Sequence, residues 1–438
     1  MSYKAYVVEI KELRKHENAD RLLIATVFGN DVVVGLNVEV GDIMVYFPTD
    51  GQLSEEFAVL NDLVRRKDEN GNNAGGYLDP NKRNIKAIHL RGEKSDGMLA
   101  PLSSLSKVLG ESYVKKHIKV GDAIDIVNGV EICKKYVPKT KANKSMPKHQ
   151  SKKISLKDKY PLFQEHRDTS QLAYSLNSFR DGDLLTISLK LHGTSGRTSR
   201  TIASNKSWLS KLLGTFGIKL ANKWETISGT RRVILENYKG GYYGSNDFRQ
   251  QYHDLLEGKL HKGETVYYEI VGYADKGRPI MGTVDNKKLK NKEFVKRYGD
   301  TTTFTYDCED GKSDIYIYRM TMTNEDGEVF EYPTWLTRIR SEQMGVKHVP
   351  VLMTMTYNED TDDLLEIANM LGEGSDLIDP THIREGVIVR VENRDKFTAY
   401  KHKSFEFKVL EGIIKEDADE PDMEEAQDLI DEGDIAYA

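Results

Sequence analysis

The sequence has little that would place the chain in a membrane or in an oxidising compartment. Its 438 residues contain no run of about 18 apolar residues, the length that a membrane-spanning helix needs. The opening residues, Met1 to Tyr6, lack the basic-then-apolar pattern of a secretory signal peptide. The two cysteines, Cys133 and Cys308, lie far apart, which indicates a reducing compartment and no cysteine-based metal site. We therefore expect a cytoplasmic protein, or one of the host-cell cytoplasm if the source is viral.

Positive charge is missing from the last stretch of the chain. Residues 416–438 contain eleven Asp or Glu residues and no Lys or Arg. Removing these eleven charges from the formal net charge of −6 leaves +5 on the remaining residues. A mildly basic body is compatible with a polyanionic partner but does not require one. We interpret residues 416–438 as an acidic tail.

Residues 1–133 have the pattern of many short strands separated by turns. Dipeptides typical of turns, such as Gly29-Asn30 and Asp50-Gly51, separate the apolar segments. Closely spaced strands of this kind indicate a small β-barrel. Residues 17–22, Glu-Asn-Ala-Asp-Arg-Leu, resemble the entry of tRNA-binding OB-fold domains, and residues 86–99 look like a later strand pair of the same barrel. This resemblance implies RNA binding. A small barrel with no nucleic-acid role is the alternative.

The composition changes after this region. Residues 134–159 contain ten lysines and few apolar side chains, so they cannot bury enough surface to fold alone and we interpret them as a linker. Its lysines are either solvated or in contact with the phosphates of a nucleic acid. Residues 160–415 have the mixed α/β pattern of a second domain. There we expect a strand at 184–190, an insertion at 202–228, and helices at 246–258, 334–343 and 360–371.

A lysine at the end of a strand is central to the second domain. In Ile187-Ser188-Leu189-Lys190-Leu191-His192-Gly193, apolar and polar residues alternate until Gly193 interrupts the strand. Lysine acts as a nucleophile only when deprotonated, so burial or neighbouring cations must lower its pKa. Lys-x-x-Gly alone is a common way for a strand to end. The assignment therefore depends on support from elsewhere in the chain.

Three later segments supply that support. Tyr267-Tyr268-Glu269-Ile270 and Glu385-Gly386-Val387-Ile388 each place one acid beside apolar strand residues. Lys401-His402-Lys403 ends a further strand. A single acid on a strand is usually just exposed, and Lys-x-Lys at a strand end is usually solvated. The order and spacing of all four segments argue against chance.

Together the four segments resemble the covalent nucleotidyltransferase superfamily, which contains RNA ligases, DNA ligases and mRNA capping enzymes. The resemblance implies that Lys190 is the nucleophile and Glu385 a metal ligand. It implies nucleotide contacts from Leu191, Arg231, Glu269, Tyr318, Lys401 and Lys403, with His192, Gly193, Arg197 and Tyr316 as further candidates. Two choices stay open: Tyr316 or Tyr318 for stacking on adenine, and Arg231 or Arg232 for the arginine motif.

His192 and the domain order narrow the resemblance. DNA ligases and capping enzymes carry Asp at the position of His192 and place their OB domain after the catalytic domain. Here about thirty largely acidic residues follow Lys408, and the OB-like region is N-terminal. This arrangement resembles the RNA ligase 5 (Naegleria-type) family. It implies a multidomain fold: an N-terminal all-β OB-fold barrel (1–133) and a C-terminal α+β nucleotidyltransferase domain of the ATP-grasp-like ligase type (160–415).

The resemblance also implies the reaction. We expect an ATP-dependent RNA ligase of RNA repair that uses ATP as the AMP donor, Mg²⁺ or Mn²⁺, and lysyl-AMP and RNA-adenylate intermediates. Its expected partner is RNA, as a nicked duplex with 3′-OH and 5′-phosphate ends, and it is expected to act as a monomer. The alternatives are a nick-sealing DNA ligase and a non-catalytic RNA-binding protein with a vestigial nucleotide pocket. His192 argues against the first, and the retained Lys190 and Glu385 argue against the second.

Overall fold

The structure is a computed structural model that describes residues 3–138, 156–204, 223–235, 238, 243, 247–358 and 361–417. Most of the expected linker, the middle of the expected insertion and nearly all of the acidic tail lie outside these residues. The chain divides into two compact units. The first takes the described residues of Met1–Lys139, Val284–Thr301 and Lys403–Glu420, and the second takes those of Thr140–Thr283 and Thr302–His402. No helix of the described residues is long and apolar enough to cross a membrane.

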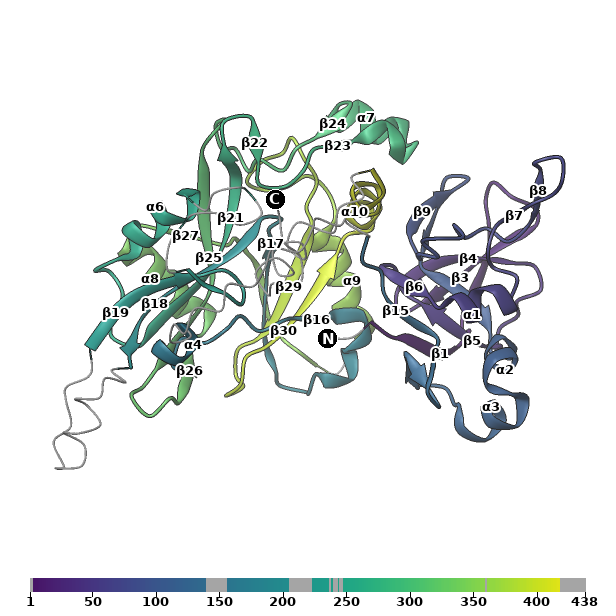
Figure 1. The fold of residues 1–438 in the computed structure, drawn as a ribbon, viewed down its shortest axis with the longest axis horizontal. Helices are drawn as coiled ribbons and strands as arrows, with labels where there is room; N and C mark the ends of the chain where they lie inside the picture. Colours follow the sequence, from purple (N-terminus) through teal and green to yellow (C-terminus); the bar gives the residue numbers. More distant parts are fainter. Residues whose placement is uncertain are drawn as a thin grey trace, which may run out of the picture. The chain divides into compact units, whose positions relative to one another are not determined.

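The first unit consists mainly of short strands (Figure 1). The helices of this unit are α1 (Glu55–Leu60), α2 (Ser103–Leu109), α3 (Glu111–His117), the 3₁₀ helix η3 (Asn286–Leu289), α7 (Lys292–Tyr298) and α10 (Phe405–Asp417). Its strands are β1 (Ala5–Glu9), β2 (Leu13–Lys15), β3 (Leu22–Val27), β4 (Asn30–Gly35), β5 (Ile43–Phe47), β6 (Gly51–Leu53), β7 (Arg66–Lys67), β8 (Asn73–Gly75), β9 (Ala87–Leu90), β10 (Glu93–Asp96), β11 (Met98–Pro101), β12 (Ala123–Ile124), β13 (Ile126–Val127), β14 (Val130–Glu131), β15 (Cys133–Lys135) and β23 (Val284–Asp285).

The core of the first unit lies against one four-stranded sheet. The sheet has the order β11-β5-β1-β12, and its apolar residues pack with those of α1 and α2 around Phe47 and Phe57. The other strands of this region form separate small sheets, among them β2-β3-β4 and β9-β10. The described residues therefore confirm a β-rich N-terminal region. The prediction that it is all-β is wrong, because the region also contains α1, α2 and α3, and the strand pairing does not close into one barrel.

The helix α10 follows the last sequence motif and lies in the first unit. Lys408 Nζ is 2.5 Å from Asp96 Oδ2 on β10, and His89 Nε2 on β9 is 3.0 Å from Glu406 Oε1. The Lys408–Asp96 ion pair, the His89–Glu406 hydrogen bond and the edge-on contact of the His89 and Phe405 rings fasten α10 to β9 and β10. The helix is therefore tied to strands that lie over 300 residues earlier in the sequence.

The second unit contains two sheets with helices. Its helices are α4 (Leu156–Lys159), the 3₁₀ helices η1 (Leu172–Tyr174) and η2 (Leu176–Ser178), α6 (Asp247–Leu256), α8 (Thr334–Met344) and α9 (Thr361–Gly372). Its strands are β16 (Ser170–Gln171), β17 (Leu184–Lys190), β18 (Thr194–Ala203), β19 (Lys223–Gly229), β20 (Ile234–Leu235), β21 (Glu264–Asp275), β22 (Arg278–Pro279), β24 (Thr301–Thr302), β25 (Ser313–Thr323), β26 (Val329–Glu331), β27 (Lys347–His348), β28 (Val351–Thr356), β29 (Gly386–Val391) and β30 (Thr398–Lys403).

The two sheets have mostly antiparallel strands (Figure 1). The five-stranded sheet has the order β16-β30-β29-β17-β28, and the eight-stranded sheet is built on β20-β19-β18-β21-β25-β26. The predicted strand at 184–190 and the three predicted helices are confirmed as β17, α6, α8 and α9, within about two residues at each end. The ends of the predicted insertion are strand residues of β18 and β19, which pair with each other.

Candidate active site

Lys190 is the last residue of β17, and strand alternation sets the direction of its side chain. The odd-numbered apolar residues of β17 are buried on one face, so the even-numbered Thr186 and Lys190 lie on the other. In register with β29, Lys190 lies beside Gly386 and Thr186 beside Arg390. The five-stranded sheet thus carries the predicted nucleophile on the face that also bears Arg390.

Glu269 lies on the face of the eight-stranded sheet that is directed toward the five-stranded sheet, which carries Lys190. The guanidinium carbons of Arg319 and Arg390 lie 4.4 and 5.4 Å from the centroid of the same Phe397 ring. Arg319 pairs with Tyr267, which lies two residues before Glu269 on β21, so Arg319 and Glu269 are on the same face of the eight-stranded sheet. The Lys190 and Glu269 faces therefore meet across Phe397.

Lys190 is paired with the predicted metal ligand. Its Nζ lies 2.7 Å from Glu385 Oε1, and the Glu385 side chain is only 2% exposed against 19% for Lys190. The other carboxylate oxygen, Oε2, is 3.9 Å from His192 Nδ1. The structure therefore brings together three of the predicted site residues. A protonated amine has no lone pair for attack, so Lys190 must lose a proton before it can act as a nucleophile.

The turn after Lys190 requires glycine at position 193. A Cβ atom on Gly193 would lie 2.2 Å from the carbonyl oxygen of Ile270 and 3.1 Å from Cγ of Glu269. The first distance is too short for any Cβ and involves backbone, which cannot easily move aside, whereas the second would need only a small shift of the Glu269 side chain. Gly193 thus lets β18 approach β21 closely enough that Ser195 Oγ donates a hydrogen bond to Glu269 Oε2 at 3.3 Å. The predicted site residue Gly193 has a steric role here.

Two buried side chains hold this turn, and neither was predicted from the sequence. The Tyr306 hydroxyl accepts a hydrogen bond from the His192 backbone N–H at 2.6 Å. Arg249, from α6, donates to the Thr194 hydroxyl at 2.7 Å and to the Ser195 carbonyl at 2.9 Å. Both lie outside the four sequence motifs, and no spacing rule connects them to Lys190. Their role depends on tertiary contacts alone.

A cluster of rings lies behind His192. The His192 ring packs edge-on against Phe304, 4.8 Å between centroids, and Phe304 lies 5.0 Å from the ring of His382. His382 is fully buried and also packs against Tyr306. Burial raises the pKa of Tyr306 well above its ordinary value, so this phenol stays protonated at neutral pH. These packed rings support the turn after Lys190 from one side.

Both candidate tyrosines for adenine stacking lie on β25 near Glu269. Tyr316 is directly across the strand pair from Glu269, and its hydroxyl is 3.4 Å from Lys347 Nζ. The strand register shifts after Ile317, which leaves Tyr318 in an irregular position between paired residues. The Tyr318 hydroxyl lies 3.1 Å from His166 Nδ1. Both tyrosines remain candidates, with Tyr316 the nearer to Glu269 in register.

The predicted arginines have different surroundings. Arg197 is fully buried on β18, and its guanidinium donates to the backbone carbonyls of Thr230 and Gln164. Burial lowers the pKa of Arg197 to about 10, which leaves it charged at neutral pH. Arg231 and Arg232 both lie near Asp168, at 3.3 and 3.5 Å, and Arg231 is the less exposed of the two. Arg197 therefore fixes the backbone around the site, whereas the other two remain alternatives for nucleotide contact.

The last motif lies on β30, which is separated from β17 only by β29. Lys401 alternates along β30 with His402, whose ring bonds Asn369 of α9 at 2.7 Å, so Lys401 lies on the opposite face from α9. Lys403 ends β30, and its Nζ is 2.8 Å from Glu411 Oε2 on α10. Leu191, which follows the predicted nucleophile, is buried.

The donor set fits a metal ion that is held partly by the substrate. Among the described residues, no group of three or more His, Cys, Asp or Glu side chains could hold a metal by itself. Glu385 offers one nearly buried carboxylate next to Lys190. Mg²⁺ in nucleotide enzymes is commonly bound by one or two carboxylates, substrate phosphates and water. Glu385 is compatible with such a site.

A comparison with family models identifies the chain. The model of the RNA ligase family matches residues 183–410, more than half of the chain. The chain belongs to the RNA ligase family. The matched segment begins just before β17, ends in α10 and contains all four motifs, so the RNA ligase predicted from the sequence is confirmed. A search of curated proteins found no match to this RNA ligase.

Solved structures support the fold. The RNA ligase of Naegleria gruberi with pyrophosphate has a TM-score of 0.56 and 16% sequence identity, with 95% of this chain and 98% of that chain covered. A variant of the same ligase with ATP and Mn has a TM-score of 0.55 at 15% identity, covering 92% and 98%. At this identity the likeness shows the fold alone. It confirms the predicted multidomain α+β architecture.

Proposed function

We propose that this RNA ligase is ATP-dependent and joins RNA 3′-OH and 5′-phosphate ends through lysyl-AMP and RNA-adenylate intermediates. The observation that carries the proposal is the placement of Lys190 at a strand end, 2.7 Å from the carboxylate of Glu385. A nucleophilic amine and a buried acid are the groups that such chemistry needs. The similar Naegleria gruberi structures are of a ligase with AMP and Mn, with ATP and Mn or with pyrophosphate, and they support the choice of nucleotide and metal.

In the first step, the deprotonated Lys190 amine attacks the α-phosphorus of ATP. An N–P bond forms, the bond from the α-phosphorus to the bridging oxygen breaks, and pyrophosphate leaves with that electron pair. The AMP then passes to the RNA 5′-phosphate, and the 3′-hydroxyl displaces it in the last step. Each step is a phosphoryl transfer, in which positioning and charge stabilisation supply most of the catalysis.

The surrounding residues have the chemistry to bind the nucleotide. Glu269, on the face that meets Lys190's sheet, can accept hydrogen bonds from ribose hydroxyls. Tyr316 or Tyr318 can stack on the adenine ring. Lys401 and Lys403 can place positive charge beside the phosphates, where it stabilises the charge that develops in the transition state. Lys403 would first have to leave Glu411, to which it is now paired.

Glu385 is the residue that would hold a Mg²⁺ or Mn²⁺ ion. When bound, such an ion supplies positive charge that neutralises the phosphate oxygens during transfer. Engagement of Glu385 elsewhere would also remove it from Lys190, because Oε1 now lies 2.7 Å from the lysine Nζ. The amine would then be able to lose its proton and attack.

The N-terminal region is proposed to be an OB-fold domain that binds RNA, and residues 134–159 a linker whose lysines contact phosphates. The support is the sequence resemblance at residues 17–22, the β-rich fold of the first unit and the ten lysines. RNA affinity should fall as salt rises, because phosphate contacts release counterions. Replacing Lys141, Lys144 and Lys148 by Gln should reduce the slope of log affinity against log salt by about two to three. An unchanged slope would remove these lysines from the RNA interface.

The test of the first step uses α-labelled ATP. Wild-type protein should acquire label in an acid-labile, alkali-stable and hydroxylamine-sensitive bond, as a phosphoramide requires, and Lys190→Ala should acquire none, because alanine has no nucleophile. Lys259→Ala is a matched control, since Lys259 lies outside the four motifs and bonds the carbonyl of Met344. Label on Lys190→Ala would show that another residue is the nucleophile.

The test of the substrate uses matched nicked duplexes made of RNA, of DNA and of each hybrid. RNA ligation predicts sealing of the all-RNA nick with ATP and a divalent metal, and none in EDTA. A preference for the all-DNA nick would instead support a DNA ligase. Analytical ultracentrifugation of the same preparation tests the expected monomer.

A further inference from the structure

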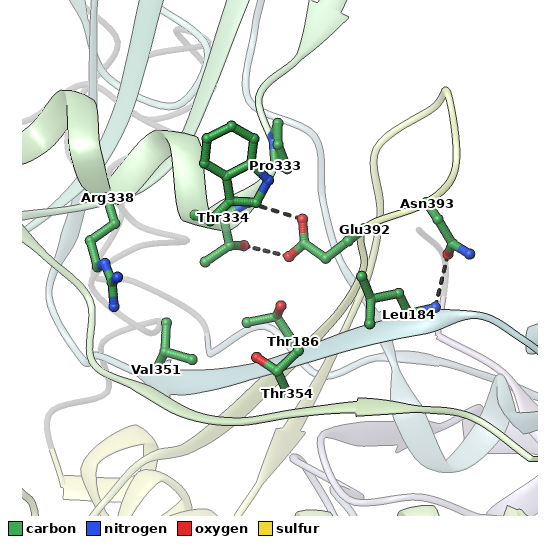
Figure 2. A pocket seen from close by; sticks show the side chains of 10 residues that line it. Leu184, Thr186, Pro333, Thr334, Arg338, Val351, Thr354, Glu392 and Asn393 are labelled. Carbon is green, nitrogen blue, oxygen red and sulfur yellow. Dashed lines mark hydrogen bonds between the residues drawn. The ribbon is translucent and has the colours of Figure 1, made fainter.

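A pocket of about 490 Å³ lies in the second unit, along the part of β17 that precedes Lys190 (Figure 2). Residues of β17, β28 and α8 line it, including Thr186, Thr354, Trp335 and Arg338, together with the two residues that follow β29. Its volume is in the range of sites for small ligands. None of the four motifs contributes a side chain to it, so the reaction described above leaves this pocket unused.

The walls of the pocket are rigid on one side. Glu392 accepts hydrogen bonds from both the backbone N–H and the hydroxyl of Thr334, which fixes the start of α8 against the end of β29 (Figure 2). Asn393 accepts a hydrogen bond from the Leu184 backbone N–H at 2.9 Å and donates one to the Gly182 carbonyl at 2.9 Å. These polar groups are already engaged. They shape the pocket and are not the groups that would recognise a ligand.

The groups available to a ligand are an aromatic ring, a cation and two hydroxyls. Trp335 is 61% exposed, although tryptophan is usually well buried. Arg338 lies one turn further along the same face of α8, and its side chain is 61% exposed. Its Nε is 4.0 Å from Glu342 Oε1, which is a long distance for an ion pair. The floor carries the hydroxyls of Thr186 and Thr354, which lie side by side (Figure 2) and can each donate or accept.

These groups match one nucleotide of a nucleic acid strand. An exposed indole offers a stacking surface for any base, and an arginine beside it can bind the adjoining phosphate. Hydroxyls that both donate and accept tolerate any base edge. An acidic or purely apolar ligand would leave the indole or the arginine without a partner of matching chemistry.

The position of the pocket suits the RNA substrate. Thr186 and Lys190 lie on the same face of β17, about 13 Å apart along the strand at the usual rise per residue. On β28, Val351 lines the pocket and pairs with Ser188, which is midway between them. A strand whose end reacts near Lys190 could therefore place a nearby nucleotide in the pocket.

We propose that this pocket binds one nucleotide of the RNA substrate, with the base stacked on Trp335 and its phosphate at Arg338. The proposal rests on the RNA ligase function and adds a substrate-binding site to it. A second copy of the chain is the competing occupant, because Trp335 and Val351 are exposed apolar residues. The concave shape and the flanking Arg338 favour a nucleotide, since an interface between copies would need a broad apolar face.

Intrinsic fluorescence tests the stacking directly. The chain has three tryptophans, so Trp208→Phe/Trp224→Phe protein reports on Trp335 alone. In EDTA, to prevent turnover, an all-RNA nicked duplex should quench this emission in a saturable manner. The midpoint should agree with RNA affinity measured by anisotropy of an end-labelled duplex. Binding by anisotropy without any change in Trp335 emission would overturn the proposal.

Kinetics test the energetic contribution. Trp335→Ala should raise KM for nicked RNA about five- to a hundredfold, the loss expected for one stacked base, with a smaller change in kcat. Trp335→Phe should restore most of the affinity, because phenylalanine keeps a stacking face. Arg338→Gln should raise KM and reduce its dependence on salt. Met370→Ala, which removes an exposed side chain on α9 outside the pocket, should change neither quantity.

The outcomes distinguish this proposal from the function on which it rests. All of these variants should form lysyl-AMP at the wild-type rate, because that step uses no RNA. Absence of lysyl-AMP and of sealing in the wild type would refute the proposed function itself. Wild-type sealing together with an unchanged KM in Trp335→Ala would refute only the pocket. A wild-type dimer that Trp335→Ala converts to monomer would identify the pocket as an interface between copies and also overturn the proposal.

Discussion

The backbone N–H of His192 donates a hydrogen bond of 2.6 Å to the hydroxyl of Tyr306, which lies 114 residues later in the chain. His192 is two residues from the proposed nucleophile Lys190, so this bond helps to set where the strand ends and the turn begins. Tyr306 itself has a left-handed backbone with φ of 50°, as does Asp307 at 60°. Asp379 holds this conformation, because its Oδ2 accepts bonds from Thr305 and from the Asp307 backbone. The geometry at Lys190 therefore depends on a distant loop.

Tyr306→Phe is expected to slow lysyl-AMP formation. The substitution keeps the ring that packs against His382 but leaves the buried N–H of His192 without its acceptor. A buried unsatisfied donor costs about 1–3 kcal/mol, part of which should appear as a reduced rate and part as lower stability. Single-turnover labelling with α-labelled ATP and thermal unfolding measure the two parts.

Tyr252→Phe is the matched control for that experiment. Tyr252 is also buried, and its hydroxyl bonds Ser313 at 2.8 Å, away from the turn after Lys190. It should lose stability without a change in the rate of lysyl-AMP formation. If both variants lose rate in proportion to stability, Tyr306 has a general structural role and does not specifically position the turn.

Glu385→Gln and Glu385→Ala are expected to remove ligation. Neither residue can replace a charged carboxylate as a ligand for Mg²⁺ or Mn²⁺. Gln keeps the size of the side chain, so its loss of activity would report on charge, whereas Ala also opens space beside Lys190. The measurement is the rate of sealing of an all-RNA nick over a range of metal concentrations. Full activity of Glu385→Gln would remove Glu385 from the metal site.

The buried pair of Glu264 and Arg340 predicts a pH-dependent stability. Burial alone would raise the pKa of Glu264, but hydrogen bonds from Arg340 and from the His261 backbone lower it overall. A lowered pKa in the folded state stabilises the protein above the ordinary carboxyl pKa of about 4.3 and loses that effect as the pH falls through the folded value. The pair should therefore stabilise the folded protein at neutral pH and lose this stabilising effect in acid.

Glu264→Gln measures this contribution. At pH 7 it should lower the free energy of unfolding by about 3–5 kcal/mol, the cost of breaking a buried ion pair from one side. The difference from wild type should shrink as the pH falls below about 4. Glu309→Gln, which removes an exposed pair with Lys312, should have no measurable effect. A difference that is constant with pH would mean that the carboxylate charge is not the cause.

The sequence predicted the parts of the site that depend on local pattern. Apolar and polar alternation identified β17 and placed Lys190 at its end, because the two-residue period of a strand is visible in the sequence. Glu269 and Glu385 were identified by the order of the four segments and their resemblance to the motifs of the nucleotidyltransferase superfamily. The helices α6, α8 and α9 were predicted from the spacing of apolar residues along one face of a helix.

The rest depends on contacts between distant segments. Tyr306 and Arg249 reach the turn after Lys190 from separate elements, and no periodicity links them to it. The irregular register near Tyr318 is likewise a property of the β21–β25 pair and not of the β25 sequence. The domain boundaries and the OB fold predicted for residues 1–133 stay predictions, because the described strands of that region form several small sheets.

The last prediction concerns the sugar at the 3′ side of the nick. The attacking 3′-hydroxyl has a neighbouring 2′-hydroxyl only in RNA, and a site that hydrogen-bonds this group leaves its own polar atoms unpaired when DNA is offered. Such a loss is about 1–3 kcal/mol per group, or roughly tenfold to a hundredfold in rate. The 5′-phosphate strand contributes mainly its phosphate, so its sugar should matter less. We therefore expect fast sealing when the 3′-OH strand ends in ribonucleotides, even if the adjoining 5′-phosphate strand is DNA. The converse hybrid should be sealed slowly.

Single-turnover assays with pre-adenylylated nicks measure this last step separately from lysyl-AMP formation. Equal rates for the two hybrids would show that no 2′-hydroxyl is recognised at the 3′ side of the nick.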